Sequence, residues 1–361
     1  MKIVHITSHI GHGGDWTIIR TLMEVFQENK HQVMIAGCRA SATQFDDIEI
    51  PLNQGAKGFL QSLFKLGKIP KDTDIAHAHS PASLLFALSL KYLRCPSLKI
   101  IFTYHWQTAD SSLKRKIKGF LFNWADIIHS YSKDIFEVLA KEYQVDSAKN
   151  YLCYVGANPN RFRVCTPKEK QQFRDDDKIN QETFVLLFAG RLSIEKNIGL
   201  ILKYLASRQG KDLLFLLAGD GPLKEHLQQE IKTLKIENSV RFLGRVNNIE
   251  QVYALSDLLV LPSSAMETFG MVVIEAAFCG IPTLRSNLPG ARDQINHGED
   301  GFIFPIQEPE KMFTILDQIV EQRSTLPEVG QKARDRALKN FTLEKMYESF
   351  LTLYGANNET I

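Results

Sequence analysis

The sequence lacks most of the features that would set it apart from an ordinary globular protein. Its 361 residues include only five cysteines and no Cys-x-x-Cys pair, which excludes a disulfide framework and a cysteine-based zinc site and fits a reducing cytoplasm. No run approaches 18 uninterrupted apolar residues, so no segment is predicted to span a bilayer, and the first residues are not typical of a signal peptide.

The chain as a whole also lacks a large net charge, because its 43 basic residues nearly balance its 41 acidic ones. The two halves differ, however. Residues 1–170 contain 22 basic and 15 acidic side chains, whereas the remainder contains 21 and 26. We therefore expect the first half to face something anionic, such as a membrane surface or a phosphorylated substrate. The basic runs are too short to predict nucleic-acid binding.

Short β-rich runs alternate with amphipathic helical stretches along most of the chain, which predicts parallel sheets with helices on both faces. In the first half, strands are expected at 3–8, 32–37, 75–79, 99–104 and 126–130, with helices over 16–28 and 134–142. In the second half, strands are expected at 183–189, 213–218, 240–243, 258–261, 283–285 and 301–304, with helices over 223–234, 271–279 and 342–354.

The alternation lapses in a polar, charged stretch, which indicates a boundary between two doubly wound α/β domains. We expect a first domain over 1–165, a linker over 166–182, a second domain over 183–340 and a final helix over 341–361. Ligands of open α/β sheets bind beyond the carboxyl ends of the strands. The loops that follow strands are therefore where chemistry is expected.

The first such loop contains Gly13 and Gly14 and leads into a helix. Glycine lets a backbone approach a phosphate closely, and a helix N-terminus presents free N–H groups to an anion. The spacing is not that of the dinucleotide fingerprint, since no glycine stands three residues after Gly13, and this makes a dehydrogenase the least favoured enzyme. An ordinary tight turn explains the loop equally well.

In the second domain, Arg191 and Lys196 follow a buried strand on a loop that leads into a helix. Arginine, through two parallel N–H groups, and lysine, as a point charge, can both bind one diphosphate. A solvated charged loop is the alternative interpretation. Gly219, in a Gly-Asp-Gly-Pro turn at the end of another strand, is by itself a weak signal.

Glu267 and Glu275 stand eight residues apart in an otherwise apolar stretch. If a helix begins near Gly270, Glu267 precedes it and Glu275 lies more than one turn inside it, so the two carboxylates mark opposite ends of an extended polar ligand. The backbone amides near Phe269 to Met271 would then face an anion between them. A favourable first-turn charge and an ordinary helix-surface residue are the alternative interpretation.

Six segments in series resemble glycosyltransferase family 4, which implies a GT-B fold: two Rossmann-like domains facing a cleft, with the last helix returning to the first domain. Single motifs would be weak, but their order and spacing together are specific, and they are dense between residues 188 and 305. The segments are Gly190-Arg191-Leu192-Ser193-x-x-Lys196-Asn197, Gly219-Asp220-Gly221-Pro222, Phe242-Leu243-Gly244, Glu267-x7-Glu275, Ala276-Ala277-Phe278-Cys279-Gly280-Ile281-Pro282 and Asn296-His297-Gly298-Glu299-Asp300-Gly301-Phe302.

The resemblance implies a role for each matching residue. In the donor site, Arg191 and Lys196 would hold the diphosphate, Glu267 the sugar hydroxyls and Glu275 the ribose hydroxyls. Arg245 and Val246 would contact the base, and the backbone near Phe269, Gly270 and Met271 would contact the sugar and phosphate. Gly13 and Gly14 would lie near the diphosphate, and His105 would reach the reacting sugar. Gly190 and Gly219 complete the implied donor site.

The sequence departs from the family pattern near Gly14, where Asp15 stands in place of the Glu that often follows the paired glycines. The alternating His77 and His79 invite comparison with a metal site, because alternate strand residues point the same way. No carboxylate or cysteine pattern completes a ligand shell, and the family's chemistry needs no metal. We therefore expect no cofactor and no bound metal.

Two segments mix basic and large apolar residues, residues 57–68 and 113–124. In the second, residues 113, 117, 120, 121 and 124 keep helical spacing, which fits an ordinary core stripe with a solvated basic face. Peripheral contact with an anionic membrane is the alternative. The predicted location is the cytoplasm, with attachment to the inner face of the cytoplasmic membrane left open.

The function that the resemblance implies is retaining transfer of a sugar from a nucleotide-diphosphate-sugar to a hydroxyl of a glycan or glycolipid. Retention by double displacement needs a carboxylate nucleophile near the anomeric carbon. Neither Asp nor Glu adjoins His105 in the sequence, so same-face attack is the simpler expectation. A catalytically inactive partner protein and a nucleotide-sugar epimerase are the alternatives.

Overall fold

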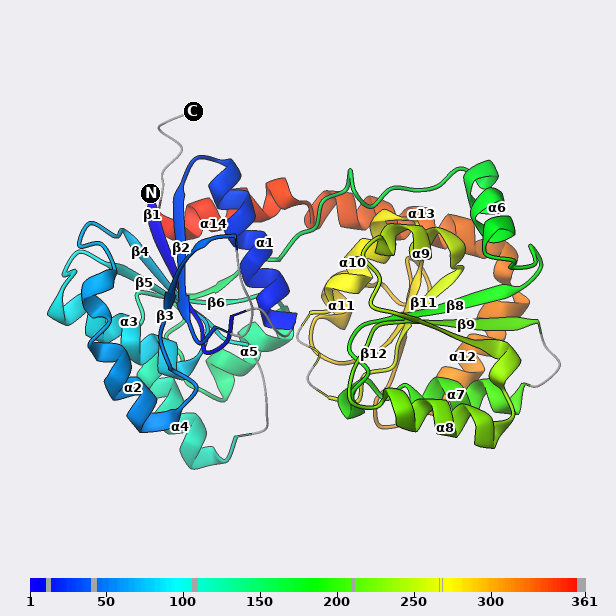
Figure 1. Cartoon of the computed structure of the whole chain (residues 1–361), viewed down its shortest axis with the longest axis horizontal. Helices are drawn as coiled ribbons and strands as arrows, with labels where there is room; N and C mark the ends of the chain where they lie inside the picture. Colours follow the sequence, from blue (N-terminus) through cyan, green and yellow to red (C-terminus); the bar gives the residue numbers. More distant parts are fainter. Residues whose placement is uncertain are drawn as a thin grey trace. The chain divides into compact units, whose positions relative to one another are not determined.

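The computed structural model describes residues 1–10, 14–39, 44–105, 110–208, 212–265, 267 and 269–355. The chain forms two compact units (Figure 1). Unit 1 comprises Met1–Val155 and Leu343–Ile361, and unit 2 comprises Gly156–Thr342. Each unit contains one sheet in which every strand pair is parallel. The expected fold class, two parallel-sheet α/β domains, is confirmed.

The sheet of unit 1 has seven strands in the order β3-β2-β1-β4-β5-β6-β7. The strand order reverses between β1 and β4, which places the topological switch point at their carboxyl ends. The strands are β1 (Lys2–Ile6), β2 (Gln32–Gly37), β3 (Asp46–Glu49), β4 (Ile75–Ala78), β5 (Lys99–Thr103), β6 (Ile127–Ser130) and β7 (Asn150–Leu152). The helices are α1 (Gly14–Glu28), α2 (Gly55–Leu63), η1 (Leu66–Lys68), α3 (Pro81–Leu93), α4 (Ser112–Phe122), α5 (Lys133–Lys141) and α14 (Leu343–Tyr354).

The sheet of unit 2 has six strands in the order β10-β9-β8-β11-β12-β13, with its switch point between β8 and β11. Its central strands are continuous apolar runs because helices bury both faces. The strands are β8 (Phe184–Ala189), β9 (Leu213–Ala218), β10 (Val240–Gly244), β11 (Leu258–Leu261), β12 (Thr283–Ser286) and β13 (Phe302–Phe304). The helices are α6 (Pro167–Asp176), η2 (Ile194–Lys196), α7 (Gly199–Ser207), α8 (Lys224–Leu234), η3 (Glu237–Ser239), α9 (Ile249–Leu255), α10 (Met271–Phe278), α11 (Ala291–Gln294), α12 (Lys311–Glu321), η4 (Arg323–Thr325) and α13 (Leu326–Asn340).

The last helix, α14, packs on unit 1 although it follows the whole of unit 2 in sequence. It contacts α1, where the Phe26 ring meets Tyr347 and Tyr354 with centroids 5.1 and 5.0 Å away. The Tyr354 hydroxyl also lies 2.8 Å from Nδ1 of His77 in β4. The last helix therefore packs against the first unit, as the resemblance implies.

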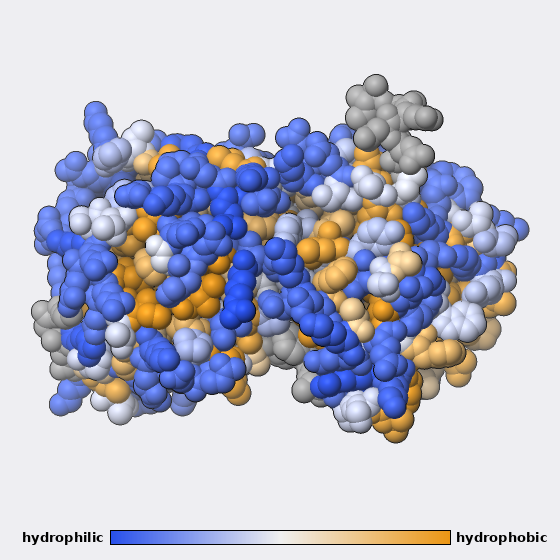
Figure 2. Space-filling view, turned by 180° about the vertical axis from the view of Figure 1, so that it is seen from behind, coloured by the Kyte–Doolittle hydropathy of each residue, from blue (hydrophilic) through white to orange (hydrophobic). Residues whose placement is uncertain are grey.

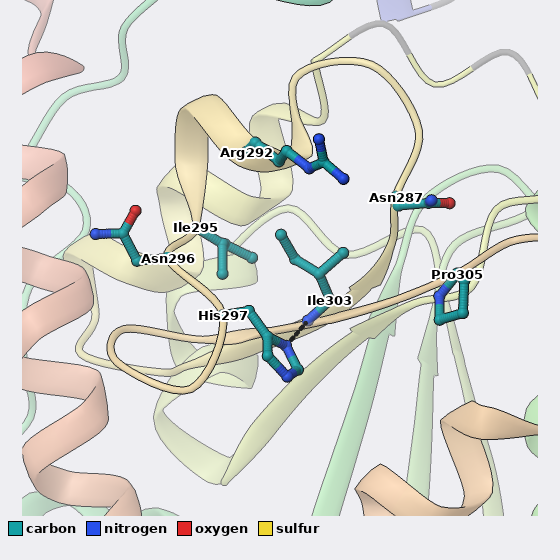
Figure 3. A pocket seen from close by; sticks show the side chains of 7 residues that line it. All are labelled: Asn287, Arg292, Ile295, Asn296, His297, Ile303 and Pro305. Atoms are coloured by element: carbon teal, nitrogen blue, oxygen red, sulfur yellow. Dashed lines mark hydrogen bonds between the residues drawn. The ribbon is translucent and has the colours of Figure 1, made fainter.

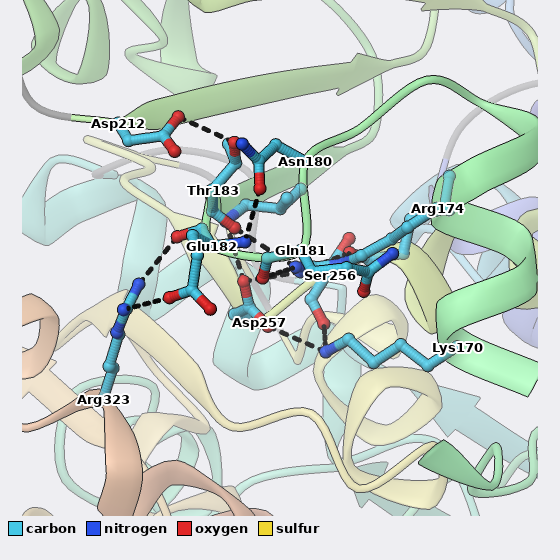
Figure 4. Close-up of polar contacts among 12 residues, drawn as sticks. Lys170, Arg174, Asn180, Gln181, Glu182, Thr183, Asp212, Ser256, Asp257 and Arg323 are labelled. Atoms are coloured by element: carbon cyan, nitrogen blue, oxygen red, sulfur yellow. Dashed lines mark hydrogen bonds and ion pairs between the residues drawn. The ribbon is translucent and has the colours of Figure 1, made fainter. Parts of the chain in front are cut away.

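The stretch 166–182, expected as a linker, contains α6 and belongs to unit 2, whose limits lie at Gly156 and Thr342. A buried guanidinium ties it there: Arg174 is only 3% exposed. It donates to the carbonyl oxygens of Leu255, Gln181 and Thr183 and to Asp257 (Figure 4). A charged, polar composition indicates solvent exposure, so the sequence alone does not reveal this buried anchor.

Candidate functional site

The predicted donor-binding residues of unit 2 gather at the carboxyl edge of its sheet. Gly190, Arg191 and Lys196 follow β8, Gly219 follows β9, and Glu267 follows β11. Strands β8 and β11 are hydrogen-bonded neighbours at the switch point. Ligands of open α/β sheets bind in this position, so the fold brings together residues that are more than 70 positions apart in sequence.

The glycine loops after β8 and β9 touch each other. A Cβ built on Gly219 would lie 1.8 Å from the carbonyl oxygen of Gly190, and Gly219 has a φ of +154°. Only glycine fits there without displacing the neighbouring backbone. Gly219 is therefore required by the packing of the two loops, and Gly190 is favoured by its φ of +153°, whether or not a ligand binds.

Lys196 and Glu267 form the centre of this edge. The Lys196 ammonium lies 2.6 Å from Oε2 of Glu267, and the Ser263 hydroxyl donates to the same oxygen at 3.2 Å. The backbone N–H of Ser264 donates to the carbonyl oxygen of Glu195 at 2.8 Å, which ties the loop after β11 to the loop after β8. Ser263 and Ser264 were not predicted from the sequence, because a serine in a loop carries no distinguishing pattern.

The N-terminus of α10 begins beside Glu267. Gly270 caps it in the left-handed region, with φ +82°. Beneath it, Arg285 in β12 is fully buried and donates to the carbonyl oxygen of Phe269 at 2.9 Å. Arg285 therefore holds the loop at Phe269, which orients the N-terminus of α10. The partial positive charge of that N-terminus favours an anion. No pattern in the sequence indicates this buried arginine.

Glu275 lies inside α10 and is half-buried. The Tyr253 hydroxyl donates to its Oε2 at 2.9 Å, and burial raises the pKa of Glu275. Burial disfavours the ionised form, whereas the Tyr253 hydrogen bond favours it. Tyr253 thus fixes the carboxyl group in one orientation, a partner that sequence spacing could not identify.

The remaining donor-site residues are less constrained. Arg191 is exposed, and no hydrogen bond joins its guanidinium to any residue in the described part of the chain. Arg245 is 86% exposed at the side chain, and its Nε lies 3.8 Å from Asp220. Val246 and Met271 are half-buried. Their assignments to the diphosphate, the base and the sugar stay predictions.

In unit 1, the predicted His105 lies just beyond β5 and is buried. Its Nε2 is 3.1 Å from Nδ1 of His79, its Nδ1 is 3.1 Å from the Asp15 carboxylate, and the Tyr131 hydroxyl also contacts the ring. Both ring nitrogens therefore have partners within the unit. Gly13 lies outside the described residues, and Gly14 is the first residue of α1.

His77 and His79 have a third companion, His5 in β1. One nitrogen from each of the three lies within 4.8 Å of the others. Among the described residues, this is the group whose geometry could hold a metal ion. His5 is paired in register with His77 across two adjacent strands, a neighbour that sequence analysis missed. Burial lowers the pKa of all three, to about 3 for His5, and their nitrogens already bond to one another and to Thr103 and Tyr354.

Two pockets in unit 2 lie away from these residues. One, of about 460 Å³, adjoins the end of β12 and the segment around His297, whose Nδ1 accepts the Ile303 N–H (Figure 3). The other, of about 630 Å³, lies at the opposite edge of the sheet, near Arg174 and Asp257. Neither pocket is lined by a predicted donor residue.

Comparisons with known proteins cover both units. The family model "Glycosyl transferases group 1" matches residues 169–336, and "Glycosyltransferase Family 4" matches residues 12–161. The N-acetyl-alpha-D-glucosaminyl L-malate synthase of Bacillus anthracis is 25% identical over 79% of this chain and 75% of its own length. The UDP-Gal:alpha-D-GlcNAc-diphosphoundecaprenol alpha-1,3-galactosyltransferase of Escherichia coli is 25% identical over 82% of this chain and 78% of its own length.

Solved structures share the fold. Anabaena HepE in complex with UDP-glucose has a TM-score of 0.81 at 20% identity and covers 98% of this chain and 99% of its own. WaaG, a glycosyltransferase involved in lipopolysaccharide biosynthesis, has a TM-score of 0.77 at 15% identity and covers 98% of this chain and 100% of its own. At this level of identity the likeness establishes the fold.

Proposed function

Because this chain belongs to glycosyltransferase family 4, we propose that it moves a sugar from a nucleotide-diphosphate-sugar to a hydroxyl of a glycan or glycolipid acceptor. That it is a glycosyltransferase follows from both family models and from the relatives. The donor assignment rests on one observation: Lys196 and Glu267 are paired at the carboxyl edge of unit 2, beside the N-terminus of α10.

The cationic part of this edge binds the diphosphate. Lys196 has three N–H donors and gives one to Glu267, which leaves two for phosphate oxygens. Arg191, exposed at the start of the same loop, supplies a second cation. Negative charge on the diphosphate grows as the glycosidic bond breaks, so these fixed positive groups stabilise the transition state more than the ground state.

The two carboxylates bind the sugar and the ribose, Glu267 the sugar and Glu275 the ribose. Ser263 and Lys196 both bond to Oε2 of Glu267, which leaves Oε1 to accept hydrogen bonds from sugar hydroxyls. Glu275, held by Tyr253 through Oε2, has Oε1 for the ribose hydroxyls in the same way. The two acids thus bind different parts of the donor.

We further propose that the reaction retains the anomeric configuration through attack on the same face. Glu267 is already tied to Lys196 and Ser263, which suits a sugar-binding acid better than a free nucleophile. The departing phosphate then takes the acceptor's proton while Arg191 and Lys196 hold it. His105 contacts the reacting sugar and forms no covalent bond to it. No bound metal is required in this scheme.

Incubating the protein with a panel of nucleotide-sugars and a lipid extract tests this function. Mass spectrometry of the products identifies donor and acceptor, and proton NMR of the first-formed product gives its configuration. We expect an α-glycoside from an α-donor. A β-glycoside would contradict retention, an isomerised sugar without acceptor consumption would indicate an epimerase, and nucleotide binding without turnover would indicate an inactive protein.

We also propose that unit 1 contacts an anionic membrane through its helices α2, α3 and α4, which pack side by side (Figure 1). Most of the stripe expected to be core is instead exposed: Phe120 is 71% and Ile117 61% accessible, whereas Leu121 packs partly against the core. Trp124 is also exposed, and its ring lies near those of Phe120 and of Tyr92 from α3. In Figure 2 hydrophobic surface is visible beside hydrophilic surface at the lower edge of this unit.

Charge supports a membrane as the occupant of this surface. Helix α4 interleaves its exposed apolar residues with Lys114, Arg115, Lys116 and Lys118. Apolar insertion combined with lysines and arginines at the headgroup level is typical of helices that lie in an interface. Among the described residues, none of the helices has the length and apolarity to cross a bilayer.

Vesicle flotation tests this contact. Wild-type protein should float with vesicles rich in anionic lipid and lose that binding as salt is raised. The double variant Phe120→Ser, Trp124→Ser should float at least about tenfold less, because each apolar side chain contributes to insertion. Leu338→Ser, a change at an exposed leucine of unit 2, is the matched control. Equal flotation of all three proteins would contradict the proposal.

A further inference from the structure

A line of contacting polar side chains runs through unit 1 from the start of α1 into the sheet. Asp15 Oδ1 lies 3.1 Å from Nδ1 of His105, Nε2 of His105 lies 3.1 Å from Nδ1 of His79, and Nε2 of His79 lies 3.0 Å from Nδ1 of His5. The three histidines are buried. The Nε2 atom of His5, at the inner end, is buried without a hydrogen-bond partner among the described residues.

Such a line must be ordered in one direction, because a neutral imidazole carries one N–H and one lone pair. An ionised carboxylate only accepts, so Asp15 requires the proton of His105 on Nδ1. Nε2 of His105 then accepts from Nδ1 of His79, and Nε2 of His79 accepts from Nδ1 of His5. The inner end is left with a bare lone pair at Nε2 of His5.

The opposite order is unfavourable at both ends. It would bury an unpartnered N–H at Nε2 of His5, and orphaned donors are rarer in proteins than under-used acceptors. It would also turn Nδ1 of His105 into an acceptor facing Asp15, with only the Tyr131 hydroxyl to donate to it. Burial keeps the inner rings neutral, since it lowers the pKa of His5 to about 3 and that of His79 well below its usual range.

We propose that Asp15 and His79 are positioning residues for His105, with Asp15 fixing its proton on Nδ1 and His79, backed by His5, fixing the ring from the other side. This inference rests on the proposed function for its catalytic consequence. A carboxylate that accepts from a histidine orients the ring and makes it more electron-rich, which favours positive charge next to the ring. Asp15 therefore supports His105 when positive charge develops on the sugar.

A second line in the same unit provides a matched control. It runs from Tyr354 through His77, Thr103 and His129 to the carbonyl oxygen of Cys153, with distances of 2.8, 2.6, 2.8 and 2.9 Å. This line does not include His105. Tyr354→Phe breaks its outer bond and leaves Asp15 and His79 in place.

Long-range proton–nitrogen NMR of the full chain with labelled histidines tests the order without any substrate. His105, His79 and His5 should all carry the proton on Nδ1 in the wild type and in Tyr354→Phe. In Asp15→Asn the amide can donate to Nδ1 of His105, so the three rings should switch to Nε2–H. Asp15→Glu should restore Nδ1–H. Protonation of His105 on Nε2 in the wild type, or an unchanged spectrum in Asp15→Asn, would overturn the proposal.

The kinetic arm uses the same four proteins. Asp15→Asn should lower kcat at least tenfold with the KM for the donor little changed, whereas Asp15→Glu and Tyr354→Phe should keep most of the wild-type kcat. A switched tautomer with wild-type kcat would contradict the positioning role. If the protein transfers no sugar at all, the proposed function fails, and the tautomers still decide whether Asp15 orders the line.

Discussion

The two units share one architecture and carry opposite chemistry at the carboxyl edges of their sheets. Unit 1 lines its edge with buried imidazoles, including His5, His77 and His79, whose pKa values burial lowers. Unit 2 lines its edge with an ion pair, Lys196 and Glu267, and an exposed Arg191. The difference therefore resides in a few side chains at or near the ends of the strands, not in the parallel sheet that both units share.

The difference follows from what each edge must hold. The proposed diphosphate is anionic, and it would need cations that water or a ligand can reach; Lys196 is 18% exposed at the side chain. Neutral rings cost less to bury than charges, and unit 1 encloses them completely. The comparison predicts that acid should damage unit 1 and that removal of a cation should damage catalysis in unit 2.

The largest expected effect is on the acid stability of unit 1. Burial lowers the pKa of His5 to about 3 and that of His129 to about 4. The unfolded chain takes up protons near pH 6.5 while the folded unit does not, so stability is complete above pH 6.5 and is lost as pH falls towards the folded values. Moving from pH 7 to pH 5 should cost about 2 kcal/mol for each of the two histidines.

Urea unfolding followed by tryptophan fluorescence measures this loss selectively, because all three tryptophans, Trp16, Trp106 and Trp124, belong to unit 1. The control is His226→Gln, since His226 is exposed in unit 2, and it should leave the pH dependence as in the wild type. An unfolding midpoint that is the same at pH 7 and pH 5 would refute the prediction.

The next effect concerns the cation of unit 2. Lys196→Ala removes the charge proposed to face the leaving diphosphate and leaves Glu267 buried without its cation. Turnover at saturating donor should fall about 100-fold, the usual order for losing one preorganised electrostatic group. The turnover of Arg191→Ala should be at least about tenfold lower than that of the wild type. Lys203→Ala, at an exposed lysine in α7, should turn over like the wild type; wild-type turnover in Lys196→Ala would exclude the assigned role.

The smallest expected effect is that of metal removal. His5, His77 and His79 lie close enough to hold a metal, yet each already bonds to neighbouring side chains. Dialysis against a chelator should therefore change neither the rate of transfer nor the urea midpoint of unit 1. A loss of activity that zinc restores, together with zinc recovered from the untreated protein, would show that the cluster is a metal site.

Much of this fold could be predicted from the sequence because its central strands are short, apolar and separated by amphipathic helices. Strands expected at 213–218 and 258–261 match β9 and β11 to the residue. The short edge strands β3 and β7 were missed: they contain three and one polar residues respectively and carry little apolar signal. Edge strands bury less surface, so composition identifies them poorly.

The site was predicted in its chemistry but not in its contacts. The spacing of Glu267 and Glu275 pointed to a polar ligand, whereas their partners, Ser263 in the same loop as Glu267 and Tyr253 in α9, have no signature in sequence. Likewise the stripe in α4 has helical spacing, yet periodicity cannot tell a core-facing stripe from an exposed one. That distinction depends on what the fold packs against it.

Calorimetric titration of two variants tests most directly the central claim that unit 2 divides the donor between its two acids. Glu275→Ala should weaken binding of the free nucleotide diphosphate about tenfold, because ribose hydroxyls lose an acceptor worth about 1–3 kcal/mol. Glu267→Ala should bind the free nucleotide diphosphate like the wild type and weaken only the sugar-bearing donor. The reverse order, with Glu267→Ala losing the free nucleotide and Glu275→Ala keeping it, would contradict the account.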